Sequence, residues 1–209
     1  MTWYADLEPF DFGGRVSDKL LAVGWLERKY PFAQSQVDRD IIDRFAECIW
    51  TRGRHTPLAL LGFHGCSLCG DEADISWEQW PDGRWMSDAP AMPPLTYNGA
   101  GISLGSSNVC IPGTTAAYLA PSLMLHYMDQ HSYAPPAEFC DALMRCPPIG
   151  SEAYYQALAP VVPPWMESWV RNRGSWSERA SAARNGGAGP EPVSYTHLRA
   201  HETDSYLVC

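Results

Sequence analysis

Long apolar runs and an excess of basic residues are both missing from this sequence. No apolar run approaches the roughly 20 residues that a membrane-spanning helix needs. The 15 Lys and Arg residues are outnumbered by 24 Asp and Glu, and the net charge of -9 argues against nucleic acid or an anionic membrane as a partner. Residues 1–8 lack the basic and apolar segments of a secretory signal. We therefore expect a cytoplasmic protein, whose cysteines are free thiols or metal ligands rather than disulfides.

Motifs of several enzyme classes are absent as well. Neither 99–101 (GAG) nor 105–107 (GSS) has the lysine and the full spacing of a phosphate-binding loop. His64 is not followed two positions later by the glutamate that zinc deaminases require. These absences remove nucleotide-dependent chemistry and base deamination from the leading predictions.

The C-terminal residues 193–209 look like translated adapter DNA from a sequencing library. Residues 193–203 (VSYTHLRAHET) follow one reading frame of a transposase-type adapter, and the last six residues fit a barcode and the flanking primer. We exclude this segment from the search for a fold and a site. The histidines that remain are His55, His64, His126 and His131, and the cysteines are Cys48, Cys66, Cys69, Cys110, Cys140 and Cys146.

A histidine and two cysteines lie close together in residues 62–70 (GFHGCSLCG). Cys66-x-x-Cys69 is the usual spacing of two zinc ligands on one tight turn, and His64 would point to the same side as Cys66 on a strand. A further ligand has to come from a distant segment. His131 is the best candidate, because it ends a predicted helix on the apolar face, and His126 is second. We predict a metal site made of His64, Cys66, Cys69 and His131, with His126, Cys110, Cys140 or Cys146 as alternatives for the fourth ligand.

Other interpretations of this cluster stay open. The cysteines could be small buried residues, with His64 as a hydrogen-bonded core histidine. A thiol–disulfide site is disfavoured because two acidic residues follow Cys69, where a reactive thiolate needs a positive environment. A hydrolase could pair Cys66 with His131 or His126, with Asp129 or Glu138 orienting the imidazole.

The apolar pattern predicts both helices and short strands. Helices are expected at 35–50, with Ser35 as N-cap, and at 121–131 and 136–146, with a shorter one at 151–159. Strands are expected at 20–26, 58–63 and 73–78, a strand pair at 100–104 with 107–111, and a long loop at 79–94. The predicted fold is one small α+β domain over residues 1–160, with a short, mostly antiparallel sheet and about three helices packed on it. Residues 161–192 are expected to be a mostly disordered tail, in which Trp165 and Trp169 could dock back on the domain.

Four stretches together resemble a known family: 3–7 (WYADL), 22–26 (AVGWL), 62–69 (GFHGCSLC) and elements of 118–139. They are similar to an uncharacterised, mainly actinobacterial domain-of-unknown-function family over about residues 2–158. The resemblance implies one intact domain in a bacterial protein. It implies no activity, because the family carries none that is established.

These observations predict a small binding or interaction protein, with a protein partner and a structural zinc ion at the His-x-Cys-x-x-Cys cluster. Neither nucleic acid nor a membrane is expected as a partner. The alternative is an enzyme that uses His64, Cys66 and Cys69 for thiol redox chemistry or metal-dependent hydrolysis.

Overall fold

The computed structural model describes residues 3–51, 65–69, 77–79, 85–87, 95–97, 100–102, 104–105 and 107–173. These residues belong to one compact unit, residues 1–175. The described helices are α1 (Arg39–Thr51), α2 (Met124–His131), α3 (Ala137–Arg145), α4 (Glu152–Leu158), the 3-10 helix η2 (Pro164–Met166) and α5 (Glu167–Arg171). The described strands are β1 (Leu20–Ala22), β2 (Trp77–Gln79), β3 (Trp85–Ser87), β4 (Leu95–Tyr97), β5 (Ala100–Ile102), β6 (Asn108–Pro112) and β7 (Ala117–Pro121).

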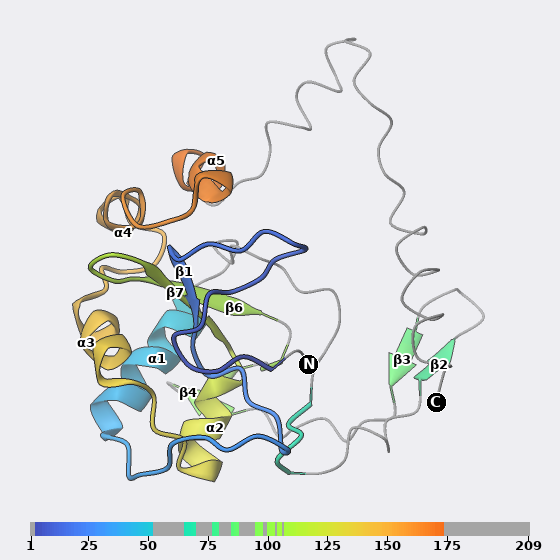
Figure 1. The fold of residues 1–209 in the computed structure, drawn as a ribbon. Helices are drawn as coiled ribbons and strands as arrows, with labels where there is room; N and C mark the ends of the chain where they lie inside the picture. The colour runs from blue at the N-terminus through green and yellow to red at the C-terminus, as the bar shows by residue number, and fades with distance from the viewer. Residues whose placement is uncertain are drawn as a thin grey trace. The chain divides into compact units, whose positions relative to one another are not determined.

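A three-stranded sheet in the order β1-β7-β6 forms the centre of the domain (Figure 1). β7 pairs in parallel with β1 and antiparallel with β6, so the sheet is mixed. All five residues of β7 are buried, as expected for an apolar strand covered on both faces. The α+β class is confirmed. The described residues hold five α-helices instead of the three or so that were expected.

Strand pairing differs from the prediction in the second half of the sheet region. Residues 108–112 pair with β7 through a tight hairpin, in which Gly113 N donates to Ala116 O at 2.9 Å. The predicted partner, 100–102, pairs instead with β4. β7 follows β6 after only a short turn and is buried at all five of its residues, and both features favour this pairing. β3 falls inside the predicted long loop at 79–94. The strand predicted at 58–63 lies outside the described residues.

α1 begins four residues later than Ser35, its predicted N-cap. The Asp38 carboxylate accepts a hydrogen bond from Asp40 N at 3.0 Å, and the Asp38 carbonyl accepts one from Ile41 N at 3.1 Å. Asp38 therefore occupies the position of a helix cap. Ser35 N instead donates to Ser132 O at 3.0 Å, which ties the segment before α1 to the end of α2.

The chain continues in an ordered form beyond residue 160, where a mostly disordered tail was expected. Residues 161–173 contain η2 and α5. Val162, Met166 and Trp169 are buried in the main hydrophobic core, and the Trp169 ring lies against Tyr155 of α4. Burying these large apolar side chains stabilises the segment more than its prolines and arginines suggest from sequence. The rest of the predicted tail lies outside the described residues, so the division of the chain into domain and tail stays a prediction.

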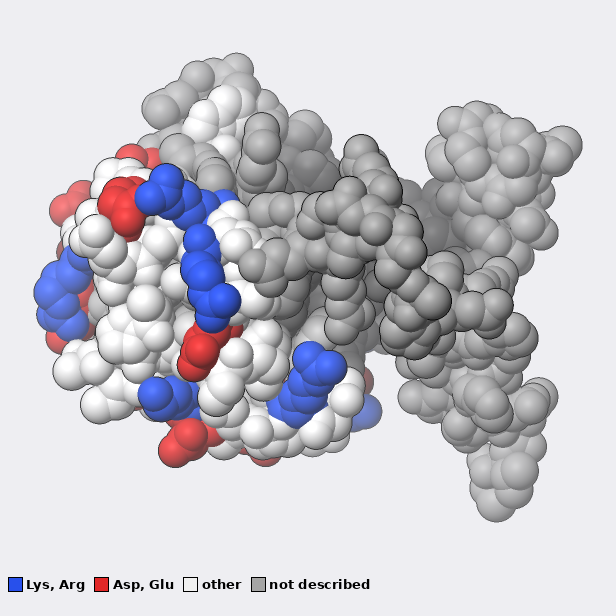
Figure 2. All heavy atoms as spheres, turned by 90° about the horizontal axis from the view of Figure 1, so that it is seen from above, with Lys and Arg blue, Asp and Glu red and all other residues white. Residues whose placement is uncertain are grey.

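Charged side chains of both signs lie on the described face that Figure 2 draws. Figure 2 shows basic and acidic residues interspersed among uncharged ones, and the basic residues do not gather into one patch on the described part of that face.

No described helix combines the length and the apolar character that crossing a bilayer requires.

α2 is anchored at both of its ends. At its start, Met124 packs over Gly24, where a Cβ added to the glycine would meet the Met124 sulfur at 2.5 Å. Just beyond its end, the Tyr133 hydroxyl donates to Asp6 at 2.7 Å, and the same carboxylate oxygen accepts a hydrogen bond from Gly24 N at 2.9 Å. Burial raises the pKa of Tyr133, so the hydroxyl keeps the proton that it donates. Asp6 thus connects Gly24, which lies beneath the start of α2, to Tyr133, which lies just beyond its end.

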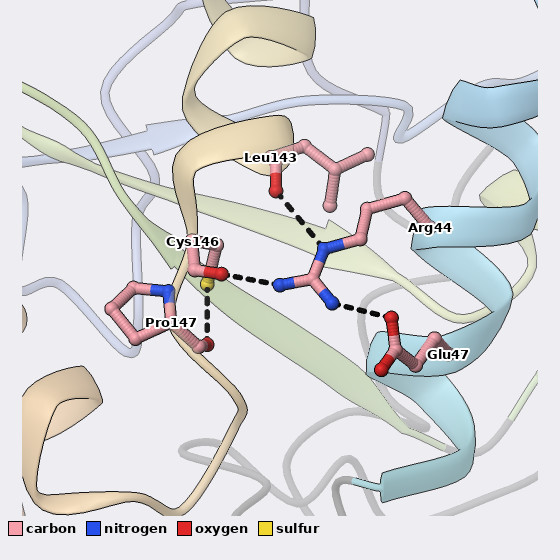
Figure 3. Close-up of polar contacts among 5 residues, drawn as sticks. All are labelled: Arg44, Glu47, Leu143, Cys146 and Pro147. Atoms are coloured by element: carbon pink, nitrogen blue, oxygen red, sulfur yellow. Dashed lines mark hydrogen bonds and ion pairs between the residues drawn. The ribbon is translucent and has the colours of Figure 1, made fainter.

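α1 and α3 are joined by Arg44, whose side chain is 18% exposed. Figure 3 shows its guanidinium between the two helices, where Nε donates to Leu143 O at 3.4 Å and a terminal nitrogen donates to Cys146 O. The other terminal nitrogen pairs with Glu47 of α1. A cation at the carbonyl end of α3 is favourable both as a donor and through the helix dipole.

We expect Arg44→Met to lower the free energy of unfolding by about 1.5–3 kcal/mol, because it removes charge-assisted hydrogen bonds from a mostly buried site. The matched control is Arg39→Met on the same helix, whose side chain is 70% exposed and pairs with Asp43 at 3.0 Å. Its cost should stay within about 0.5 kcal/mol. Urea unfolding followed by tryptophan fluorescence measures both. Equal costs for the two variants would show that Arg44 does not hold α3.

Gly24→Ala tests how α2 is seated. Gly24 has φ +73° and Gly13 has φ +60°, but a Cβ on Gly13 would have nothing within 4 Å. Both substitutions carry the left-handed strain of about 1 kcal/mol, and only Gly24→Ala adds overpacking of about 1–3 kcal/mol against buried Met124. We expect Gly24→Ala to be the more destabilising in thermal unfolding. If Gly13→Ala costs as much, contact with Met124 is not what excludes a side chain at residue 24.

Candidate metal centre

Two segments far apart in the sequence bring their metal-binding side chains together. Cys66 and Cys69 come from the short turn 65–69, and His126 and His131 come from α2. The four ligand atoms all lie within 4.8 Å of one another. Between Cys69 and His126 the sequence separation is 57 residues, so only the tertiary fold brings the pairs into contact.

The turn is closed by a hydrogen bond from Cys69 N to Cys66 O at 3.2 Å. Ser67 Oγ accepts a hydrogen bond from Arg28 N at 3.3 Å, and Leu68 packs against the hydrophobic core. The two cysteines therefore project from one short turn whose middle residues are fixed to the rest of the domain.

The distances between ligand atoms suit a tetrahedral ion. Cys66 Sγ lies 3.3 Å and Cys69 Sγ 3.3 Å from His131 Nε2. His126 Nε2 lies 3.2 Å from Cys69 Sγ and 3.2 Å from His131 Nε2. Metal–ligand bonds of about 2.0–2.3 Å place the corners of a tetrahedron about 3.3–3.8 Å apart. These four distances are close to such edges, and the other two pairs of ligand atoms lie within 4.8 Å, so the cluster could hold a metal ion.

The side chains differ in their environments. Cys66 is buried, Cys69 is exposed, and the two histidines are half-buried. Burial raises the pKa of the Cys66 thiol to about 12. Burial also lowers the pKa of His126 and of His131, and the neighbouring His131 adds to the effect on His126. Neutral imidazole is the form that binds a metal, whereas Cys66 has to lose its proton when a metal enters.

The structure brings together Cys66, Cys69 and His131 of the predicted ligand set, and His126 completes the cluster. His64 lies outside the described residues, so its predicted role as a ligand stays a prediction. The other cysteines considered for the fourth position lie elsewhere. Cys110 is on buried β6, Cys140 Sγ lies 3.8 Å from Pro135 O, and Cys146 Sγ lies 3.3 Å from Pro147 O.

His126 ranked behind His131 in the sequence analysis because a helical wheel places the two on different faces. Imidazole side chains are long enough to converge beside the last turn of the helix, and their rings are 5.0 Å apart. The signal that would have identified both was their spacing, since His-x₄-His is within the range for a zinc-binding histidine pair. The pattern was not recognised because 57 residues separate the cysteine pair from the histidine pair, counted from Cys69 to His126.

A family model described as Domain of unknown function (DUF7919) matches residues 2–144. This match confirms the resemblance to an uncharacterised domain family that the sequence motifs suggested. It includes all four cluster residues and ends before α4. No curated protein and no solved structure matches the chain.

The lowered pKa values of the two histidines predict that the metal-free protein loses stability in mild acid. The unfolded chain takes up protons near the ordinary histidine pKa of about 6.5, whereas the folded chain takes them up only at lower pH. This contribution to stability is therefore complete above about pH 6.5 and is lost as the pH falls towards the folded pKa.

Urea unfolding of chelator-treated protein between about pH 7 and about pH 5 measures this loss. The variant His126→Gln should show a weaker dependence on pH than the unsubstituted chain, because one of the two groups is gone. The half-buried Asp6 carboxyl, whose pKa is raised by desolvation, is common to both proteins and cancels in the comparison. If the free energy of unfolding depends on pH equally in both proteins, His126 does not contribute to the loss of stability in acid.

Proposed function

The chain belongs to the family of this domain of unknown function, and we propose that the domain binds one zinc ion through Cys66, Cys69, His126 and His131. In this proposal the ion is structural, and the domain acts as a zinc-stabilised binding module for a protein partner. The observation that carries the proposal is the convergence of four ligand atoms within 4.8 Å from two distant segments.

Zinc suits this set of ligands better than other common metals. Two thiolates and two imidazoles in a tetrahedral arrangement form a typical zinc site. Calcium and magnesium prefer oxygen ligands, and iron–sulfur clusters are usually held by four cysteines. The predicted involvement of His64 is not needed, because the other four side chains already fill a tetrahedral shell.

The number of ligands favours a structural role over a catalytic one. Catalytic zinc sites usually have three protein ligands and keep one position for water or substrate. Here four protein ligands close the shell. The ion would instead cross-link the turn 65–69 to α2, and it would stabilise the fold because the four ligands converge only in the folded chain.

The alternative is an enzyme that uses the same cluster, and the exposure of Cys69 is the observation that favours it. Its partner thiol is poorly suited to nucleophilic chemistry without a metal, because burial raises the pKa of Cys66 to about 12. A protonated thiol is a weak nucleophile. A structural metal site is therefore better supported than a catalytic thiol.

We expect the purified chain to contain about one zinc ion, since four ligands define one structural site. Elemental analysis of the unsubstituted protein and of Cys69→Ser, His126→Ala and His64→Ala measures the content directly. Loss of zinc in Cys69→Ser and His126→Ala, with full retention in His64→Ala, supports the proposed ligand set. If His64→Ala loses its zinc and His126→Ala keeps it, His64 and not His126 is the fourth ligand. Cys140→Ser controls for the loss of a thiol outside the cluster and should keep its zinc.

Removing zinc should lower the melting temperature. With free zinc at about 1,000 times the Kd, binding adds about 4 kcal/mol to stability. For a domain of this size that corresponds to about 8–16 °C. Differential scanning calorimetry with and without chelator measures the shift, and cobalt substitution reports tetrahedral thiolate coordination by its absorption spectrum. A stoichiometric zinc ion whose removal leaves the melting temperature unchanged would contradict a structural role.

A further inference from the structure

We propose that the zinc site is sensitive to oxidation, and that hydrogen peroxide converts Cys66 and Cys69 to a disulfide and releases the ion. This inference rests on the zinc site proposed above and adds a form of regulation to it. Two observations carry it: the unequal exposure of the two thiols and the tight turn that connects them.

Exposure selects the thiol that an oxidant reaches first. Cys69 is exposed, whereas Cys48, Cys110 and Cys146 are buried and Cys140 is half-buried. A zinc-bound cysteine is a thiolate, and the thiolate is the form that peroxide oxidises. Cys69 thus combines thiolate character with access to solvent, and it is the only exposed cysteine among the described residues.

The turn also provides the resolving thiol. The hydrogen bond from Cys69 N to Cys66 O, at 3.2 Å, is that of a tight turn, whose end Cα atoms lie less than about 7 Å apart. Disulfides span Cα separations of about 4.4–6.8 Å. The two sulfurs are already among the ligand atoms that lie within 4.8 Å of one another. A disulfide between them therefore requires only local adjustment.

The chemistry balances with peroxide as the oxidant. The Cys69 thiolate attacks one peroxide oxygen, which breaks the O–O bond and yields a sulfenic acid and hydroxide. The Cys66 thiolate then attacks the Cys69 sulfur, forms the S–S bond and expels a second hydroxide. The two sulfurs lose two electrons in total to peroxide, and the two hydroxides take up protons to become water. The zinc ion thereby loses its two thiolate ligands. Water molecules take their place, and the ion, now held by two imidazoles alone, dissociates from the protein.

The zinc-bound form and the disulfide form cross-link different parts of the chain. Zinc links the turn to α2 across sequence separations of 57 and 65 residues. The disulfide closes only the short loop within the turn, and short loops restrict the unfolded chain least. Oxidation therefore exchanges a long-range cross-link for a local one, and the turn loses its metal-mediated attachment to His126 and His131.

The test uses the full chain loaded with zinc and titrated with hydrogen peroxide. A chromogenic zinc indicator measures the released ion, and peptide mass spectrometry after alkylation measures the Cys66–Cys69 disulfide. We expect about one zinc ion released per disulfide formed, because both thiolates leave the metal together. Dithiothreitol followed by zinc should restore the loaded state.

Cys69→His is the critical variant, because it keeps four nitrogen or sulfur ligands but cannot form the disulfide. We expect it to release zinc at least about tenfold more slowly, since its one remaining thiol at the site, Cys66, is buried and inert to oxidants. Cys140→Ser retains both thiols of the turn and should release zinc at the rate of the unsubstituted protein. If Cys69→His fails to bind zinc, the ratio of disulfide to released zinc in the unsubstituted chain decides the question.

The outcomes separate the two proposals. Absence of zinc before peroxide is added contradicts the zinc site and the inference that rests on it. A loaded protein that keeps its zinc while peroxide oxidises it elsewhere contradicts the inference alone. Release of zinc with Cys66 and Cys69 still in the thiol form, or oxidised only to sulfinic acid, also contradicts the inference and leaves the zinc site intact.

Discussion

The position of α2 depends on the half-buried carboxylate of Asp6. Asp6 accepts hydrogen bonds from the Tyr133 hydroxyl and from Gly24 N, and Gly24 in turn lies directly beneath Met124. Because the two ends of α2 are held through the same side chain, the helix cannot slide or rotate without breaking a partly buried hydrogen bond. His126 and His131 take their positions from this arrangement, and with them the proposed metal centre.

The proposed zinc ion would hold the turn 65–69 on α2, whereas the hydrophobic core does not depend on it. The core is continuous from the central sheet through α1 and α3 to the C-terminal helices, so apolar burial and helix contacts such as Arg44 at the end of α3 hold it together. Among the described residues, the turn 65–69 is attached through Cys66 and Leu68, which pack with the core, and through Ser67 Oγ, which accepts a hydrogen bond from Arg28 N. A metal would add the attachment to α2, and the exposure of Cys69 would make that attachment reversible.

Local patterns predicted the elements that depend on nearby residues. The three main helices were expected within a few residues of their bounds, because their apolar spacing and flanking prolines are local signals. The Cys-x-x-Cys turn was equally readable. The strand partners were predicted wrongly, since residues 108–112 pair with β7 and residues 100–102 pair with β4. For residues 161–173 the sequence identified Trp165 and Trp169 as side chains that could dock on the domain, but it did not identify their partners, such as Tyr155 beside Trp169.

By itself, the sequence determined the α+β class, the positions of the helices, the cysteine pair and membership in a family. These properties follow from local spacing and from residue type. The tertiary structure decided which strands pair, that residues 161–173 pack on the core, and that His126 joins Cys66, Cys69 and His131. The physical reason is that convergence of ligands separated by 57 residues depends on the seating of α2 against Gly24 and Asp6, a contact that no local pattern encodes.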